Sequence, residues 1–164
     1  MQMTDNASPA EIIAISSHVV RGSVGNRAIV FSLETMGHPV WSLPTLILPW
    51  HPGHGPSTRI VIADDQFAAA IDDIVSSPWA HNLKAVISGY FGGVGQVAAV
   101  AGLVKALKAK NPDLVYLCDP VIGDLKGLYV PEPIASAIRD QLIPLADITT
   151  PNRFELGWLC GVEL

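Results

Sequence analysis

The sequence 114–124, LVYLCDPVIGD, joins a short apolar run to a polar turn that carries two aspartates. The run LVYLC is aliphatic and aromatic, which is typical of a buried strand. Asp119 and Asp124 follow directly, and we expect Gly123 to let the backbone turn sharply between them. The segment therefore predicts a strand whose carboxyl end opens into a loop with two carboxylates.

Strands and helices are predicted to alternate on both sides of this segment. Apolar or β-rich runs predict strands, and helical spacing predicts helices, at 11–16 (strand), 26–36 (helix), 40–48 (strand), 64–77 (helix), 84–88 (strand), 96–108 (helix), 114–118 (strand), 131–143 (helix) and 146–149 (strand). Pro44 indicates that its strand is interrupted or lies at an edge. Asn152 is expected to begin a last helix that the chain end cuts off. The alternation predicts an α/β fold, a doubly wound, mostly parallel sheet with helices on both faces, formed as one domain by residues 1–164. Such sheets bind ligands beyond the carboxyl ends of their strands.

Composition argues against several classes of protein. The formal net charge is -5 and no basic run is present, so nucleic acid is not expected as a partner. The N-terminus has neither the positive start nor the apolar core of a signal peptide, and the longest apolar run, 97–104, is too short to span a membrane. Cys118 and Cys160 form no CxxC pair and predict buried, reduced thiols in the cytoplasm. Hydrophobic residues make up 49% of the chain, so we expect some apolar surface that normally meets more protein.

Two predicted strand ends carry groups that could bind a cation and phosphates. Asp119 and Asp124 suit Mg²⁺, which favours a few carboxylates together with phosphate oxygens. The alternative is that Asp119 caps the turn and Asp124 is simply solvated. Asn152 and Glu155 have the spacing of a helix capping box. The functional alternative places Glu155 near a metal, with Thr150 and Asn152 near phosphates at a helix N-terminus.

The end of the first predicted strand could bind a small polar ligand. Ser17 and His18 stand there, before a turn-rich stretch that contains Gly22 and Gly25. No GK[ST] follows these glycines, which excludes a Walker phosphate loop. A serine in such a place can also serve only to cap a turn.

A dinucleotide site is a rival interpretation. Gly93, Gly95 and Ala98 match the G-x-G-x-x-A pattern between a strand and a helix, and Asp119 follows the next strand, where an acid could bind a ribose hydroxyl. It leaves the other strand-end loops without a role. The histidines of 51–54 have no further ligand nearby, so they predict a mobile loop rather than a metal site.

The chain resembles the pyridoxal kinases of the ribokinase-like superfamily. The segments that carry the resemblance, in the family's order and approximate separations, are SHVVRGSVGN (17–26), GHPVW (37–41), ISGYFGG (87–93), CDPVIGD (118–124), GLYVP (127–131) and ADITTPNRFE (146–155). The resemblance covers essentially the whole chain. It implies a ribokinase-like fold and the transfer of the γ-phosphate of ATP to the 5′-hydroxyl of pyridoxal, pyridoxine or pyridoxamine, in vitamin B6 salvage.

The same resemblance implies roles for particular residues. The substrate-binding residues would be Ser17, Tyr90 and His51. The nucleotide-binding residues would be Asp119, Thr150, Asn152 and Glu155. The metal-binding residues would be Asp119, Asp124 and Glu155, with Mg²⁺ near Asp124 and a monovalent cation such as K⁺ near Asp119. The complete protein would be a homodimer.

Two departures from the family's pattern stand out. The family commonly has S-N-H-T-[QG]-Y where this chain has PWHPGH at 49–54, so only His51 of its polar contacts is kept and the preferred vitamer stays open. The sequence contains no G-[TV]-G-D segment, which in the family supplies the catalytic base and an anion hole. We therefore expect a C-terminally incomplete kinase chain, without a catalytic residue and inactive alone. The alternatives are another ribokinase-like kinase, such as one for a hydroxymethylpyrimidine, and a non-catalytic remnant that binds a ligand or partner through an uncovered sheet edge.

Overall fold

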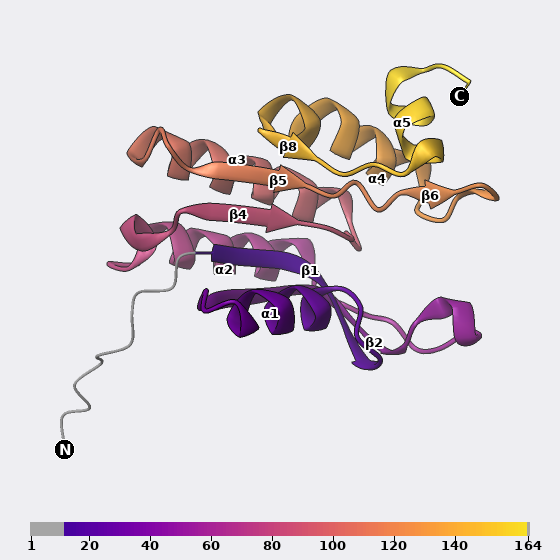
Figure 1. The fold of residues 1–164 in the computed structure, drawn as a ribbon, viewed down its shortest axis with the longest axis horizontal. Helices are drawn as coiled ribbons and strands as arrows, with labels where there is room; N and C mark the ends of the chain where they lie inside the picture. The colour runs from indigo at the N-terminus through magenta and orange to yellow at the C-terminus, as the bar shows by residue number, and fades with distance from the viewer. Residues whose placement is uncertain (1–11, 164) are drawn as a thin grey trace.

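A mostly parallel six-stranded sheet forms the centre of the computed structural model, which describes residues 12–163 (Figure 1). The strands, in their order across the sheet, are β3 (Ile60–Val61), β2 (Val40–Trp50), β1 (Ile12–Arg21), β4 (Ala85–Ser88), β5 (Val115–Cys118) and β8 (Ile148–Thr149). Neighbouring strands are parallel except β2 and β3, which are antiparallel. A separate hairpin joins β6 (Gly123–Asp124) to β7 (Gly127–Leu128).

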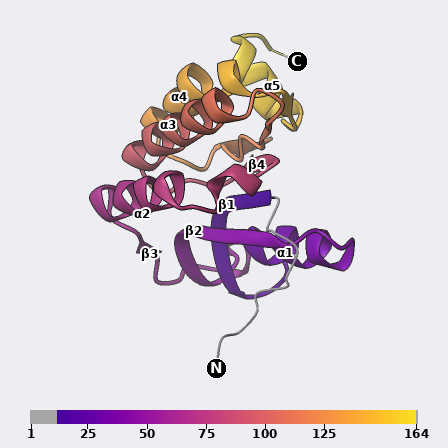
Figure 2. The ribbon, with the colours of Figure 1, turned by 90° about the vertical axis from the view of Figure 1, so that its left-hand side faces the viewer.

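Helices lie on both faces of the sheet (Figure 2). Helix α1 (Asn26–Thr35) packs on β1 and β2 from one side. Helices α2 (Asp64–Ser76), α3 (Val94–Lys110) and α4 (Glu132–Ala137) lie on the other side, and α5 (Arg153–Cys160) contacts the β6–β7 hairpin. The predicted doubly wound α/β fold is therefore confirmed.

The hydrophobic core lies between the sheet and the α2–α4 layer. Ile13, Val86 and Tyr116 are paired across β1, β4 and β5, so their side chains share one face of the sheet. All three are fully buried, together with Phe67 of α2 and Val100 of α3. The central strands β1, β4 and β5 direct alternate residues to this core, which fixes their register.

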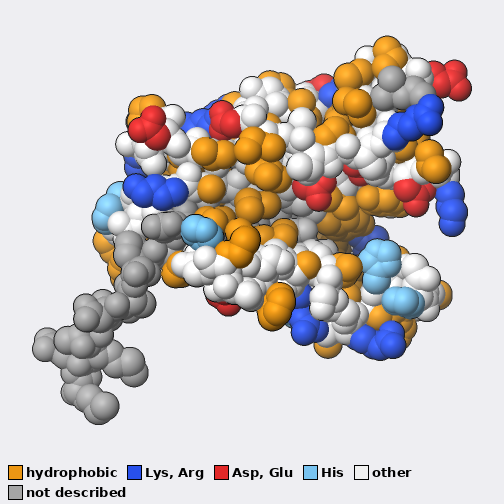
Figure 3. Space-filling model, viewed as in Figure 1, with side chains coloured by type: hydrophobic (Ala, Val, Ile, Leu, Met, Phe, Trp, Pro, Cys, Tyr) orange, Lys and Arg blue, Asp and Glu red, His pale blue; other side chains and the backbone are white. Residues whose placement is uncertain are grey.

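The opposite face is only partly covered. Ala14, Ile87, Leu117 and Ile148 form one row across it through the pairings of β1, β4, β5 and β8. Ala14 lies under α1 and is 0% exposed, whereas Ile148 is 48% exposed. Helix α1 covers only the β1–β2 side, so apolar side chains stay visible over the rest of this face (Figure 3). The apolar surface expected from the composition is therefore present.

Two strands are longer than predicted. β1 does not end at Ser16 but continues to Arg21, because β2 also continues and pairs with it as far as Trp50. Ser17 consequently lies inside a strand rather than at the start of a turn. Pro44 sits in β2 at a register shift, where β1 advances from Ser16 to His18 while β2 advances from its proline to Ile47. This bulge accommodates the missing N–H, in agreement with the predicted interruption.

The C-terminal helices also differ from the prediction. The predicted 131–143 helix is α-helical for only its first part. It then widens to a π-helix (Ile138–Leu142) and tightens to a 3-10 helix (Ile143–Leu145), where Pro144 cannot continue a regular helix. α5 ends at Cys160 with Gly161 in the left-handed conformation, φ 67°, so the chain end does not cut this helix. The strands β3, β6 and β7 were not predicted, because each has only two residues and is too short to show an alternation of apolar and polar side chains.

The thiols and the helices bear on two further expectations. Cys118 is buried as predicted, but Cys160 is exposed because it lies on the outer side of the last turn of α5. Both cysteines are free. Within the described residues, no helix is long and apolar enough to cross a membrane.

Candidate substrate and nucleotide site

A pocket of about 850 Å³ lies beyond the carboxyl ends of the central strands. It opens between the part built from β1 and β2 and the part that carries the β6–β7 hairpin, where Figure 3 shows the right-hand edge of the molecule hollowed. The predicted site residues that line it are Ser17, His51, Tyr90, Asp119, Asp124 and Asn152. Thr150 and Glu155 do not line the pocket, but they form hydrogen bonds with residues that do.

Ser17 presents a free hydroxyl to this pocket. Ser16 and Ser17 are adjacent in β1 and therefore point in opposite directions. A methyl group at Gly25 would lie 2.2 Å from the Ser17 carbonyl oxygen, and Gly25 also has φ 59°, so only glycine fits beside Ser17. Among the described residues the Ser17 hydroxyl has no hydrogen-bond partner, which leaves it available to a ligand.

Tyr90 is held in the pocket by three hydrogen bonds. Its N–H donates to Ser16 Oγ (3.1 Å), and its carbonyl accepts from Thr45 Oγ1 (2.7 Å). Thr45 reaches it because the β2 bulge follows Pro44. The phenolic oxygen accepts from an Arg59 guanidinium nitrogen at 2.8 Å. The ring is therefore fixed at backbone and side chain alike.

His51 keeps one ring nitrogen for a ligand. Its Nδ1 accepts a hydrogen bond from the Gly53 amide at 3.0 Å, at the start of the 3-10 turn η1 (Pro52–His54). A neutral imidazole that accepts at Nδ1 carries its proton on Nε2 and can donate there. Residues 51–54 therefore form a defined turn, and the predicted mobility of this loop stays a prediction.

Asp119 lies in a half-buried, negatively charged environment. Burial raises the pKa of the Asp119 carboxyl, the Thr150 hydroxyl bonded to it lowers that pKa, and the charge of Glu155 raises it again. Asp124 is exposed, and its Oδ1 accepts from the Lys126 amide at 2.8 Å. Over residues 12–163 none of these carboxylates forms an ion pair with Lys or Arg. The pocket therefore has a side of uncompensated negative charge.

Glu155 ties two loops together. Its Oε1 accepts from the amides of Ile122 (2.9 Å) and Gly123 (3.4 Å), and its Oε2 accepts from the Asn152 amide (2.9 Å). The Asn152 side chain completes the capping box by accepting from the Glu155 amide at 3.0 Å. The capping interpretation is thus confirmed. The metal role of Glu155 stays a prediction. The residue is only 3% exposed and does not line the pocket, so its carboxylate would influence a metal held by Asp119 and Asp124 through its charge rather than as a ligand.

The sharp turn in the CDPVIGD loop is made by Val121, which has φ 45°, and not by Gly123. A β-branched residue in this region is strained, and such strain persists only where the surroundings impose it. Here the Glu155 hydrogen bonds hold the next two amides. Gly123 is needed for space instead, because a methyl group there would lie 2.3 Å from the Phe154 ring.

Mg²⁺ fits the pocket on the chemistry of its donors. Within the described residues no group of three or more His, Cys, Asp or Glu could hold a metal by itself. Mg²⁺ commonly uses only one or two carboxylates and completes its shell with water and substrate phosphates. Asp119 and Asp124 offer such a pair. Burial, and then the charge of Glu155, raise the pKa of Asp119 by disfavouring its charged form, and a bound cation would favour that charged form.

The dinucleotide interpretation fits the structure poorly. The Gly95 amide, in the first turn of α3, donates to Asp64 Oδ2 at 3.1 Å. A methyl group on Gly93 or Gly95 would lie 2.7 Å or 2.3 Å from the Asp64 side chain. These glycines therefore allow α2 to pack against α3, and a carboxylate stands where a pyrophosphate would have to bind.

Sequence reasoning missed two side chains of the pocket. Arg59 directly follows the Pro- and Gly-rich stretch 49–58 and received no role, although it is the only lysine or arginine within 49–59. Tyr129 belongs to the quoted GLYVP segment but received no role. Burial raises the pKa of Tyr129, and the nearby Glu155, Asp119 and Asp124 raise it further.

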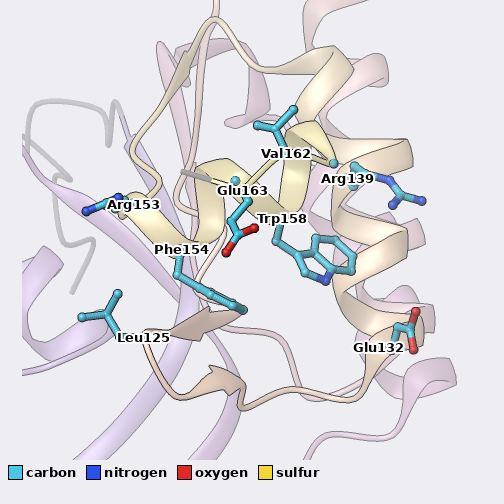
Figure 4. Close-up of a pocket in the computed structure, with 10 residues that line it drawn as sticks. Leu125, Glu132, Arg139, Arg153, Phe154, Trp158, Val162 and Glu163 are labelled. Carbon is cyan, nitrogen blue, oxygen red and sulfur yellow. The ribbon is translucent and has the colours of Figure 1, made fainter.

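A second hollow, of about 790 Å³, lies at α5 and holds none of the predicted site residues (Figure 4). Phe154, Trp158 and Val162 give it an apolar floor, and charged side chains including Arg139 and Arg153 surround it. The Arg139 guanidinium carbon lies 5.3 Å from the centre of the Trp158 ring. Phe154, which lines this hollow, also packs on Gly123 of the main pocket.

Comparison with known proteins agrees with this fold and site. No family model matches the chain. It is 40% identical to pyridoxal kinase PdxY of Corynebacterium diphtheriae over 152 residues, which is 92% of this chain and 54% of that protein. It is also 40% identical to PdxY of Deinococcus radiodurans over 157 residues, 95% of this chain and 53% of that one. The chain thus spans about half the length of the curated relatives it matches.

Solved structures give the same result. Pyridoxal kinase from Leishmania donovani in complex with ADP and pyridoxine superimposes with a TM-score of 0.88 and 30% identity, over 95% of this chain and 55% of that one. Pyridoxal kinase from Entamoeba histolytica gives a TM-score of 0.88 and 29% identity, over 93% and 54%.

The parallel sheet with a polar pocket at the carboxyl ends of its strands fits the ribokinase-like class of α/β proteins. Within that class, the predicted resemblance to pyridoxal kinases is confirmed over nearly the whole of this chain.

Proposed function

We propose that this chain forms the substrate pocket and part of the metal and nucleotide site of an ATP-dependent pyridoxal kinase. The reaction would move the γ-phosphate of ATP to the 5′-hydroxyl of pyridoxal, pyridoxine or pyridoxamine in cytoplasmic vitamin B6 salvage. The observation that carries the proposal is the single pocket that joins Ser17, His51 and Tyr90 on one side to Asp119 and Asp124 on the other. The Leishmania relative, whose solved structure holds ADP and pyridoxine, supports it.

The two sides of the pocket suit the two halves of the reaction. The free Ser17 hydroxyl, the His51 Nε2 and the fixed Tyr90 ring offer hydrogen bonds and an apolar surface to a substituted pyridine. Mg²⁺, held by Asp119 and Asp124, would neutralise the phosphate charge, and a monovalent cation such as K⁺ would bind near Asp119. Asn152 would contact the nucleotide, with Thr150 orienting Asp119. Catalysis of phosphoryl transfer depends mainly on such positioning and charge neutralisation.

The catalytic base is proposed to come from a G-[TV]-G-D segment, which this sequence does not contain. The complete kinase is proposed to be a homodimer without nucleic-acid or membrane partners. Two free cysteines, one of them exposed, suit the reducing cytoplasm.

Equilibrium titration of the 164-residue chain tests the proposal. Pyridoxal, followed by its absorbance, should bind in saturable fashion, and Ser17→Ala should weaken it about fivefold to tenfold, the loss of one hydrogen bond. Ser32→Ala, an exposed serine on α1 outside the pocket, is the matched control. ADP with Mg²⁺ should bind more weakly to Asp124→Asn. Tighter binding of a hydroxymethylpyrimidine or of NAD than of pyridoxal would contradict the proposal.

A further inference from the structure

Arg59 is a pocket residue to which the family resemblance gives no role. It directly precedes β3, and its guanidinium donates to the Tyr90 hydroxyl at 2.8 Å. The guanidinium carbon also lies 5.6 Å from the centre of the Tyr90 ring, within cation–π range. Within the described residues, no carboxylate pairs with Arg59. An exposed arginine is thus held at the mouth of the pocket by an aromatic ring and not by an opposite charge.

The charges of the pocket lie on opposite walls. Asp119 and Asp124 belong to the wall that follows β5, whereas Arg59 belongs to the wall built from β2, η1 and β3. Arg59 is the only lysine or arginine among the described residues that line the pocket. A ligand that spans the pocket therefore meets a cation at one end and carboxylates at the other.

Pyridoxal has a matching polarity. Its reacting hydroxymethyl group must face the carboxylate wall, where the metal and the phosphates would bind. The opposite edge of the ring carries the ring nitrogen, the methyl group and the 3-oxygen, which is ionised in the neutral-pH form of pyridoxal. A guanidinium binds an anionic oxygen through short, charge-assisted hydrogen bonds.

We propose that Arg59 is a specificity-determining residue that binds the anionic 3-oxygen of the pyridoxal ring, with Tyr90 holding the guanidinium in place. This rests on the proposed function and adds the ring substituent that the pocket selects. Only one of the five guanidinium N–H groups is used on Tyr90, so the others stay free for the ligand. Arg59 would also supply a polar contact on the wall where 49–54 retains only His51 of the family's pattern.

The test compares pyridoxal with 3-deoxypyridoxal, which lacks only the 3-oxygen, in titrations of the chain and its variants. Arg59→Gln should weaken pyridoxal about tenfold, the value of one charge-assisted hydrogen bond, and leave 3-deoxypyridoxal within about twofold. It should also raise the pKa of the bound 3-hydroxyl by about one unit, read from the absorbance of the ligand against pH. Arg59→Lys should restore part of the lost affinity, because lysine keeps the positive charge but not the paired N–H donors of the planar guanidinium.

Two controls separate this role from a structural one. Arg139→Gln removes an exposed arginine outside the pocket and should change neither affinity. Tyr90→Phe keeps the ring but not the hydroxyl, and should reduce the preference for pyridoxal by less than Arg59→Gln does. Equal weakening of both ligands by Arg59→Gln, or no weakening of either, would overturn the inference while the proposed function stands. If the unaltered chain bound neither ligand, both would fall.

Discussion

Replacing Glu155 by glutamine should destabilise the protein even though the two side chains have the same shape. The carboxylate is 3% exposed and accepts from three backbone amides, those of Ile122, Gly123 and Asn152. An amide group has one accepting oxygen, so its NH₂ must face at least one of these donors. The least harmful orientation turns the NH₂ toward Asn152 and leaves that single N–H without an acceptor.

An unsatisfied buried donor costs about 1–3 kcal/mol. Removal of the Glu155 charge relieves its repulsion of Asp119, so we expect the lower half of this range. For a chain of this size that corresponds to about 2–4 °C in Tm per kcal/mol, measured by circular dichroism and checked by urea unfolding. Glu155→Ala, which strands all three amides, should cost more. Glu34→Gln, an exposed carboxylate on α1, is the matched control and should have no effect.

A Tm for Glu155→Gln within about 1 °C of the unaltered chain, below the shift of one lost hydrogen bond, would refute this reasoning. It would mean that the 121–123 loop is not held by the carboxylate. Glu155 would then be free to serve a metal directly, as the resemblance implies.

Three further predictions follow from burial and charge. Asp119 has a folded-state pKa above its ordinary value of 3.8, so the native state binds more protons than the unfolded state and loses stability as pH rises from 3.8 through the raised pKa. Asp119→Asn should therefore raise the Tm at pH 7 and not at pH 3. Equal Tm shifts at both pH values would contradict this. Burial raises the pKa of the Cys118 thiol, so a thiol reagent should label only Cys160 in the native chain and both cysteines in denaturant, whereas rapid native labelling of both would place Cys118 at the surface. The sheet face that α1 only partly covers should bind a hydrophobic dye, and Ile148→Lys should reduce the fluorescence of the bound dye. Phe31→Lys, on the solvent side of α1, should not reduce it. Equal effects of the two variants would show that the dye binds elsewhere.

Local pattern was sufficient for most of the fold. The apolar run LVYLC and its neighbours at 11–16 and 84–88 predicted buried parallel strands, because only a sheet covered by helices can bury strands that lack a polar face. The end of α1 followed from Gly37, whose backbone can adopt the left-handed conformation, and the start of α5 followed from Asn152, whose side chain caps the helix. The pattern failed where strand length depends on a partner, as in the extension of β1 to Arg21 beside β2.

The sequence alone determined which residue types follow the predicted strands, and parallel pairing brings the carboxyl ends of strands to one edge, so Ser17, Asp119 and Asp124 were expected near one another without coordinates. Tyr90 was added to them by the family resemblance. Only the tertiary structure decided how each is used. It gave Glu155 three backbone amides, moved the sharp turn from Gly123 to Val121, and brought Arg59 to Tyr90 across 31 positions of the sequence. Capping, strain and long-range hydrogen bonds depend on where backbone donors lie in space, and no spacing along the chain records that.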